Sequence, residues 1–134
     1  MLPRLYSHVE RVRPTMKNAT FLARLHHALR GVLASLNTEQ SFRVQVLSFF
    51  GVLMVLLVTR PPPIWWALLL LVSGCVLTTE LINTALEKLI DHLHPDIHPA
   101  IKIVKDSLAG ALLLISISAL LVAAVFICFE VTQF

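Results

Sequence analysis

Long apolar stretches separated by short charged segments dominate the pattern of this chain. No charged residue occurs in 44–59, 64–79 or 107–129. A helix needs about 20 residues to cross a bilayer, and the shorter stretches reach that length once neighbouring residues join them. The pattern therefore predicts three membrane-spanning helices, at about 41–60, 64–90 and 106–129.

The segment before the first predicted span has a different pattern. Apolar residues recur there at helical spacing, and Arg24, His27 and Arg30 occupy the other face. This is typical of an amphipathic helix on a membrane surface, at about 18–36, with Asn18 as a candidate cap. The alternative is a soluble helix for which the sequence shows no packing partner. The apolar positions are Phe21, Leu22, Leu25, Ala28, Leu29, Val32, Leu33 and Leu36.

Composition supports this all-α membrane class. The chain has 134 residues, of which 57% are hydrophobic and 14% charged, against about 25% charged in soluble domains. A small soluble domain cannot bury so much apolar surface, and a disordered chain would be more polar. We expect a basic flexible cytoplasmic arm at 1–17 and one membrane domain at 18–134.

Positive charge predicts the orientation of the spans. Seven of the 11 Lys and Arg residues precede the first span, three lie near or after the inner end of the second, and the tail after the third has none. Short basic segments stay in the cytoplasm. We therefore expect a cytoplasmic N-terminus and an external C-terminus.

Acidic residues gather at the predicted inner ends of the spans. The five are Glu39, Glu80, Glu87, Asp91 and Asp106. On the second helix Glu80, Asn83, Thr84, Glu87 and Asp91 share one narrow face, because their spacing follows the helical repeat. A charge inside a span costs at least about 2.5–3.5 kcal/mol, so these acids should have partners.

This layout suits phosphoryl transfer to a lipid alcohol. Carboxylates at one level can hold Mg²⁺ with phosphate oxygens, and a lysine such as Lys105 can neutralise phosphate charge. A carboxylate at headgroup depth, such as Glu80, can accept a proton from a lipid hydroxyl. The chain lacks a Gly-rich phosphate loop with a following Lys. We therefore expect side chains and helix ends to hold any nucleotide.

Other interpretations remain open from the residues alone. A row of acids can line a proton or cation pathway, although the outer halves of the spans are almost wholly apolar. The acids could also be solvated or paired with Lys88 or Arg43 in a structural subunit. His92, His94 and His98 favour a solvated loop over a metal site, since two of them precede prolines.

Two segments carry a family resemblance. The run ELINTALEKLID at 80–91, followed by Lys105 and Asp106, resembles the signature of the prokaryotic diacylglycerol kinase family. The run NTEQSFR at 37–43 is similar to its first-span segment. The resemblance implies a homotrimer in the bacterial inner membrane, with active sites shared between neighbouring subunits. It also implies ATP as donor, Mg²⁺ as cofactor, a membrane lipid alcohol as acceptor and no nucleic-acid partner.

The resemblance also implies roles for individual residues. Glu80 matches the catalytic base, with Asn83 and Asp91 beside it in the catalytic site. Glu39 and Glu87 match the carboxylates that carry Mg²⁺ with ATP. The remaining matches are His27, Lys105 and Asp106 for the nucleotide, and Arg43 and Ala109, with Glu80, for the lipid.

The family has two branches, which differ in the lipid they phosphorylate. One acts on diacylglycerol and makes phosphatidic acid, and the other prefers undecaprenol. Residues 38–43, His98-Pro99 and 109–111 look more like the undecaprenol branch, whereas Asn37 and Arg43 occur in both. We keep diacylglycerol kinase as the family-level expectation and undecaprenol kinase as its alternative.

Overall fold

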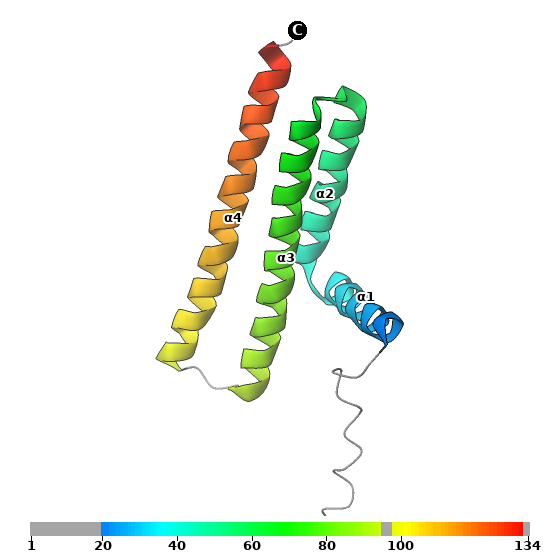
Figure 1. Ribbon diagram of the computed structural model, residues 1–134. Coiled ribbons are helices and arrows are strands. Elements are labelled where there is room, and N and C mark those ends of the chain that lie inside the picture. Colours follow the sequence, from blue (N-terminus) through cyan, green and yellow to red (C-terminus); the bar gives the residue numbers. More distant parts are fainter. Residues whose placement is uncertain (1–19, 95–97, 133–134) are drawn as a thin grey trace, which may run out of the picture. The chain divides into compact units, whose positions relative to one another are not determined.

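The structure, a computed structural model, describes residues 20–94 and 98–132. Within these ranges all regular secondary structure is helical, as predicted (Figure 1). The four helices are α1 at Phe21–Thr38, α2 at Gln40–Thr59, α3 at Pro63–Leu93 and α4 at Pro99–Thr132. The predicted basic arm at 1–17 and the candidate cap Asn18 lie outside the described residues.

Helix α1 belongs, as far as Ala34, to a compact unit distinct from the one that begins at Ser35. Its first turn is capped by Thr20, whose Oγ1 accepts a hydrogen bond from the N–H of Ala23 at 3.4 Å. Such a cap satisfies one of the free N–H groups at a helix start. Phe21, Leu22 and Leu33, which belong to the predicted apolar face, are exposed. Its contact with a membrane surface stays a prediction.

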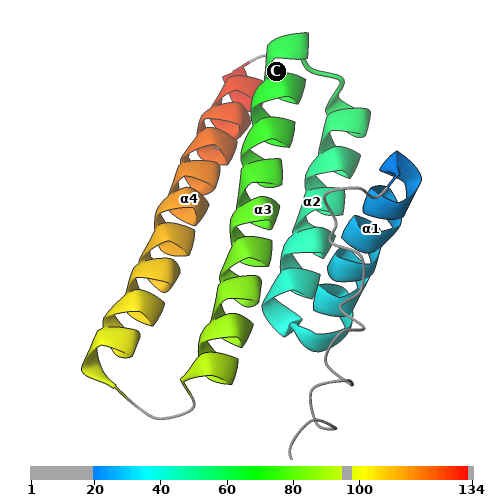
Figure 2. The same cartoon turned by 60° about the horizontal axis from the view of Figure 1, so that its bottom comes forward.

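Helices α2, α3 and α4 run antiparallel in chain order, with α3 between the other two (Figures 1 and 2). All three are long and apolar enough to cross a membrane. Helix α2 has 20 residues, which is about 30 Å and matches the hydrocarbon thickness. Helices α3 and α4 have 31 and 34 residues. Each therefore has about ten residues more than the hydrocarbon requires.

The extra length of α4 lies partly before the predicted span. The helix begins at Pro99, and the span is expected from about residue 106. Proline suits the first turn of a helix, because its missing N–H would be unpaired there. The charged turn at 102–106 is therefore helical, although its side chains are too polar for the hydrocarbon.

The turn between α2 and α3 has a defined backbone. Arg60 ends α2 in the left-handed conformation, with φ 50°, and its N–H donates to the carbonyl of Leu56 at 3.0 Å. Pro62 follows, and Pro63 occupies the first turn of α3. This chemistry ends one helix and starts the next within a few residues.

The core of the bundle lies toward that turn. Leu56, Leu69 and Phe126 are buried together, and Trp65 packs on Phe126 with ring centroids 5.4 Å apart. Most other apolar side chains of the three helices are exposed. A single chain therefore leaves its long apolar faces to lipid or to other chains.

Candidate functional site

The site is built around Glu80, an acid in the interior of the bundle. Its residue is only 4% exposed although it lies within an apolar helix. The side-chain nitrogen Nε2 of Gln45, on α2, donates a hydrogen bond to Oε2 of Glu80 at 3.1 Å. A buried charge needs such a partner, because isolated burial is strongly unfavourable. Glu80 is therefore held between α2 and α3.

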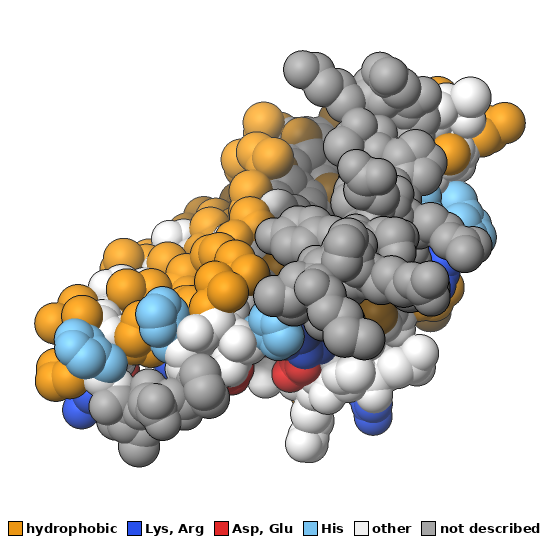
Figure 3. Space-filling view, turned by 90° about the horizontal axis from the view of Figure 1, so that it is seen from below, with side chains coloured by type: hydrophobic (Ala, Val, Ile, Leu, Met, Phe, Trp, Pro, Cys, Tyr) orange, Lys and Arg blue, Asp and Glu red, His pale blue; other side chains and the backbone are white. Residues whose placement is uncertain are grey.

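The predicted polar face of α3 becomes progressively more exposed toward the end of the helix. Glu80 and Thr84 are buried, Asn83 and Glu87 are half-buried, and Asp91 is exposed. The face thus leads from the bundle interior to the end where α3 finishes and α4 begins. Figure 3 views the molecule from that end and shows charged and histidine side chains among hydrophobic ones.

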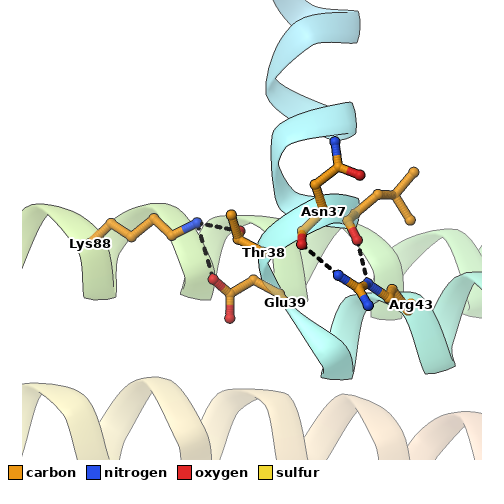
Figure 4. Close-up of polar contacts among 6 residues, drawn as sticks. Asn37, Thr38, Glu39, Arg43 and Lys88 are labelled. Carbon is orange, nitrogen blue, oxygen red and sulfur yellow. Dashed lines mark hydrogen bonds and ion pairs between the residues drawn. The ribbon is translucent and has the colours of Figure 1, made fainter.

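Glu39 joins this face through a lysine (Figure 4). The Nζ of Lys88 lies 3.0 Å from Oε1 of Glu39 and donates to Oγ1 of Thr38 at 2.7 Å. The hydrogen bond from Lys88 lowers the pKa of Glu39, and a hydrogen bond from Thr38 contributes in the same direction. Glu39 is therefore a carboxylate at neutral pH, next to α3 at the start of α2.

Three carboxylates share one electrostatic environment. Glu39 and Glu87 are near enough to Glu80 to interact with it electrostatically. A cation stabilises a group of like charges, and oxygen ligands are what Mg²⁺ prefers. Among the described residues, no three Asp, Glu, His or Cys side chains are grouped as a metal site by themselves. Mg²⁺ is commonly bound by one or two carboxylates together with substrate phosphates, and its binding by Glu39 and Glu87 stays a prediction.

Two oxygen atoms beside these acids have no donor. Within the described part of the chain, Oε1 of Gln45 and Oδ1 of Asn83 are buried and accept no hydrogen bond. Buried polar atoms are normally paired, so unpaired acceptors mark a place where a ligand supplies a donor or a cation. The sequence analysis included Asn83 among the site residues but not Gln45. The sequence did hold a sign of Gln45, because this residue is an amide within a mainly apolar stretch.

Lysine 105 and its neighbours form the exposed border of the site. Lys105 on α4 makes an ion pair with Asp91 on α3, which brings two predicted residues together. Asp106 and Ala109 lie close by on α4, and both are exposed. The Lys105 ammonium can donate to a phosphate oxygen in place of the Asp91 carboxylate, because both partners carry anionic oxygens.

Arg43 is engaged with backbone rather than with the acids (Figure 4). Its Nε donates to the carbonyl of Leu36 and its Nη2 to that of Asn37. Both carbonyls lie in the last turn of α1, where they lack helical partners. Arg43 therefore stabilises the turn into α2. His27 lies on α1, in the unit that ends at Ala34, and its part in nucleotide binding stays a prediction.

An apolar groove leads to Gln45. It has a volume of about 310 Å³ and is lined by α2, α3 and α4. Of the lining residues on α2, Gln45 is the one nearest the start of the helix. Leu69, Val72 and Val76 line it along α3, and the next turn of that helix carries Glu80. The hydrocarbon chain of a ligand fits an apolar lining of this kind, and the hydroxyl group of a ligand fits the polar end at Gln45.

The fold and the site define the class: a helical membrane protein with a carboxylate site at one end of its spans. Residues 26–127 match the prokaryotic diacylglycerol kinase family. The chain belongs to this family.

Two curated relatives have related names. The chain is 32% identical over 116 residues to "Diacylglycerol kinase" of Synechocystis sp. (strain ATCC 27184 / PCC 6803 / Kazusa), covering 82% of this chain and 66% of the relative. It is 31% identical over 85 residues to "Undecaprenol kinase" of Bacillus subtilis (strain 168), covering 63% of this chain and 69% of the relative. The chain thus spans slightly less than two thirds of the length of the first relative and slightly more than two thirds of the second. Both relatives are named as lipid kinases.

Proposed function

We propose that this protein transfers a phosphoryl group from ATP to the hydroxyl of a membrane lipid, with Mg²⁺ as cofactor. One observation carries the proposal: a buried carboxylate, Glu80, accepts a hydrogen bond from Gln45, which lines an apolar groove, and the more accessible carboxylates Glu39 and Glu87 belong to the same end of the bundle. A lipid reaches such a base from the hydrocarbon, and a nucleotide reaches the same place from water.

In the proposed mechanism Glu80 is the general base. It takes the proton of the lipid hydroxyl, so that the oxygen can attack the terminal phosphorus of ATP. Glu39 and Glu87 hold the cation, which neutralises phosphate charge when bound. Lys105 exchanges its ion pair with Asp91 for a phosphate oxygen. Asn83 and Asp106 complete the polar surroundings of the nucleotide. Positioning and charge stabilisation supply most of the catalysis in reactions of this type.

Diacylglycerol is the proposed acceptor, and undecaprenol is the alternative. The matched family and one relative are named for the first lipid, and the second relative is named for the other. Both lipids present a primary hydroxyl on long hydrocarbon chains, so the groove by itself admits either. Arg43 and Ala109 are the proposed contacts near the lipid headgroup.

The proposed function is tested by an assay on the purified full chain with radiolabelled ATP. Diacylglycerol and a polyprenol are offered side by side, each with and without Mg²⁺. We expect label in one lipid, preferentially diacylglycerol, and only when Mg²⁺ is present. Label in neither lipid contradicts the proposed activity, and label only in the polyprenol replaces the substrate.

We also propose a homotrimer in the bacterial inner membrane, with the N-terminus in the cytoplasm. The exposed apolar faces of α2, α3 and α4 support further helix packing, and small residues such as Gly74 and Ala111 permit close approach. Helix α1 would lie on the inner surface of the membrane. If active sites are shared between subunits, mixed trimers of a Glu39→Gln chain and a Glu80→Gln chain regain part of the activity that each homotrimer lacks.

A further inference from the structure

Gln45 has a position that the predicted site does not use. It lies on α2, 35 residues before Glu80, and it brings an amide group to the carboxylate from the neighbouring helix. The amide has two ends with different surroundings. Nε2 donates to Glu80, whereas Oε1 is buried and has no donor among the described residues.

The nitrogen end restrains the base. A carboxylate can rotate about its last side-chain bond, and Nε2 of Gln45 holds its Oε2 at 3.1 Å. The other oxygen, Oε1, is then left for the proton of a substrate. Proton transfer depends on such alignment, because a general base must lie within hydrogen-bond reach of the proton it removes.

The residue that carries this oxygen also lines the route by which a lipid would enter. Gln45 lines the apolar groove, and it is the polar residue nearest Glu80 on that wall. Its unpaired acceptor needs a donor, and the groove is otherwise lined mainly by hydrocarbon with a few serines. The hydroxyl of an entering lipid alcohol is a donor of the right kind.

We propose that Gln45 is a positioning residue for phosphoryl transfer: its amide nitrogen orients Glu80, and its amide oxygen receives the lipid hydroxyl at the end of the groove. This inference rests on the proposed lipid kinase function and adds a residue to it. The hydroxyl has a single proton, which it donates to Oε1 of Gln45 as the lipid enters and then transfers to Oε1 of Glu80, and Gln45 keeps both of its own amide protons.

The test compares Gln45→Met and Gln45→Glu in the full-length protein. Methionine has a similar volume without a donor or a strong acceptor, and glutamate keeps the shape but replaces the donating NH₂ with an acceptor. Thr78→Val is the matched control, because it removes a hydroxyl that donates to its own helix, at the carbonyl of Gly74. The measurements are kcat, the KM values for lipid and for ATP with Mg²⁺, and the unfolding temperature in detergent.

We expect both Gln45 variants to lose about 10- to 100-fold in kcat. KM for lipid should rise in Gln45→Met, which lacks the acceptor oxygen, whereas KM for ATP and the unfolding temperature of both variants stay near those of Thr78→Val. A Gln45→Met variant with the kcat of wild type overturns the inference, since packing alone would then explain the residue. A kcat loss that only accompanies a fall in unfolding temperature also overturns it. Absence of kinase activity in the wild type is a different result and counts against the proposed function itself.

Discussion

Lys88 on α3 binds Glu39 at the start of α2, with Nζ and Oε1 3.0 Å apart across 49 residues of sequence. The same ammonium donates to Thr38, the last residue of α1. One lysine therefore connects the α1–α2 turn to the polar face of α3. It holds the carboxylate of Glu39 against α3 within a single chain.

Removing this lysine should change how stability depends on pH. The Lys88 contact lowers the pKa of Glu39 from its ordinary 4.5. Its contribution is thus present above that pH and is lost as the pH falls through the lowered pKa. We expect Lys88→Met to lower the unfolding temperature in detergent at neutral pH. The difference from wild type should shrink on acidification below pH 4.5.

The size of that effect should be small, because the side chains of Lys88 and Glu39 are 51% and 34% exposed. Lys102→Met is a suitable control, since Lys102 is an exposed lysine of α4. An unfolding-temperature difference that stays the same from neutral pH to well below 4.5 would contradict an ionised Glu39 in this contact.

Glu80→Gln tests the base. The variant keeps the size of the side chain but cannot take the proton of a hydroxyl, so the rate of lipid phosphorylation should fall by about 100- to 10,000-fold. ATP binding, measured by equilibrium dialysis with Mg²⁺, should survive. Turnover at the wild-type rate would show that another group removes the proton.

Glu39→Gln and Glu87→Gln test the proposed cation ligands. Each change removes a negative oxygen donor, so the Mg²⁺ concentration for half-maximal activity should rise by about tenfold, or about 1.4 kcal/mol of binding. A magnesium titration of kinase activity measures this. Glu130→Gln, at the far end of α4, is the control and should titrate like wild type. Unchanged titrations in all three variants would remove both residues from the cation site.

Arg43→Lys tests the turn between α1 and α2. Lysine cannot reproduce the two separate donors that reach the carbonyls of Leu36 and Asn37. We expect the free energy of unfolding to fall by about 1 kcal/mol and proteolysis in the turn to accelerate. Arg60→Lys should change little, because that turn is held by a backbone N–H. Equal effects in the two variants would mean that the guanidinium bonds contribute nothing specific.

Hydropathy and helical periodicity were sufficient to predict the four helices. The spans expected at about 41–60 and 64–90 correspond to helices at Gln40–Thr59 and Pro63–Leu93. These boundaries follow from local chemistry, since prolines and charged residues interrupt apolar runs wherever they occur. Helix α4 begins at Pro99, before the expected span, because a charged segment can be helical outside the hydrocarbon.

The polar face of α3 was likewise predictable, because residues on one helix have fixed angular positions. Its partners on other helices were not. The bond from Gln45 to Glu80, the pairing of Lys88 with Glu39 and the groove beside them depend on how α2 packs against α3. That packing is set by side-chain shapes over the whole interface, and no local periodicity encodes it. Local spacing thus settled which acids share a face, while helix packing alone determined which of them is buried and which residue holds it.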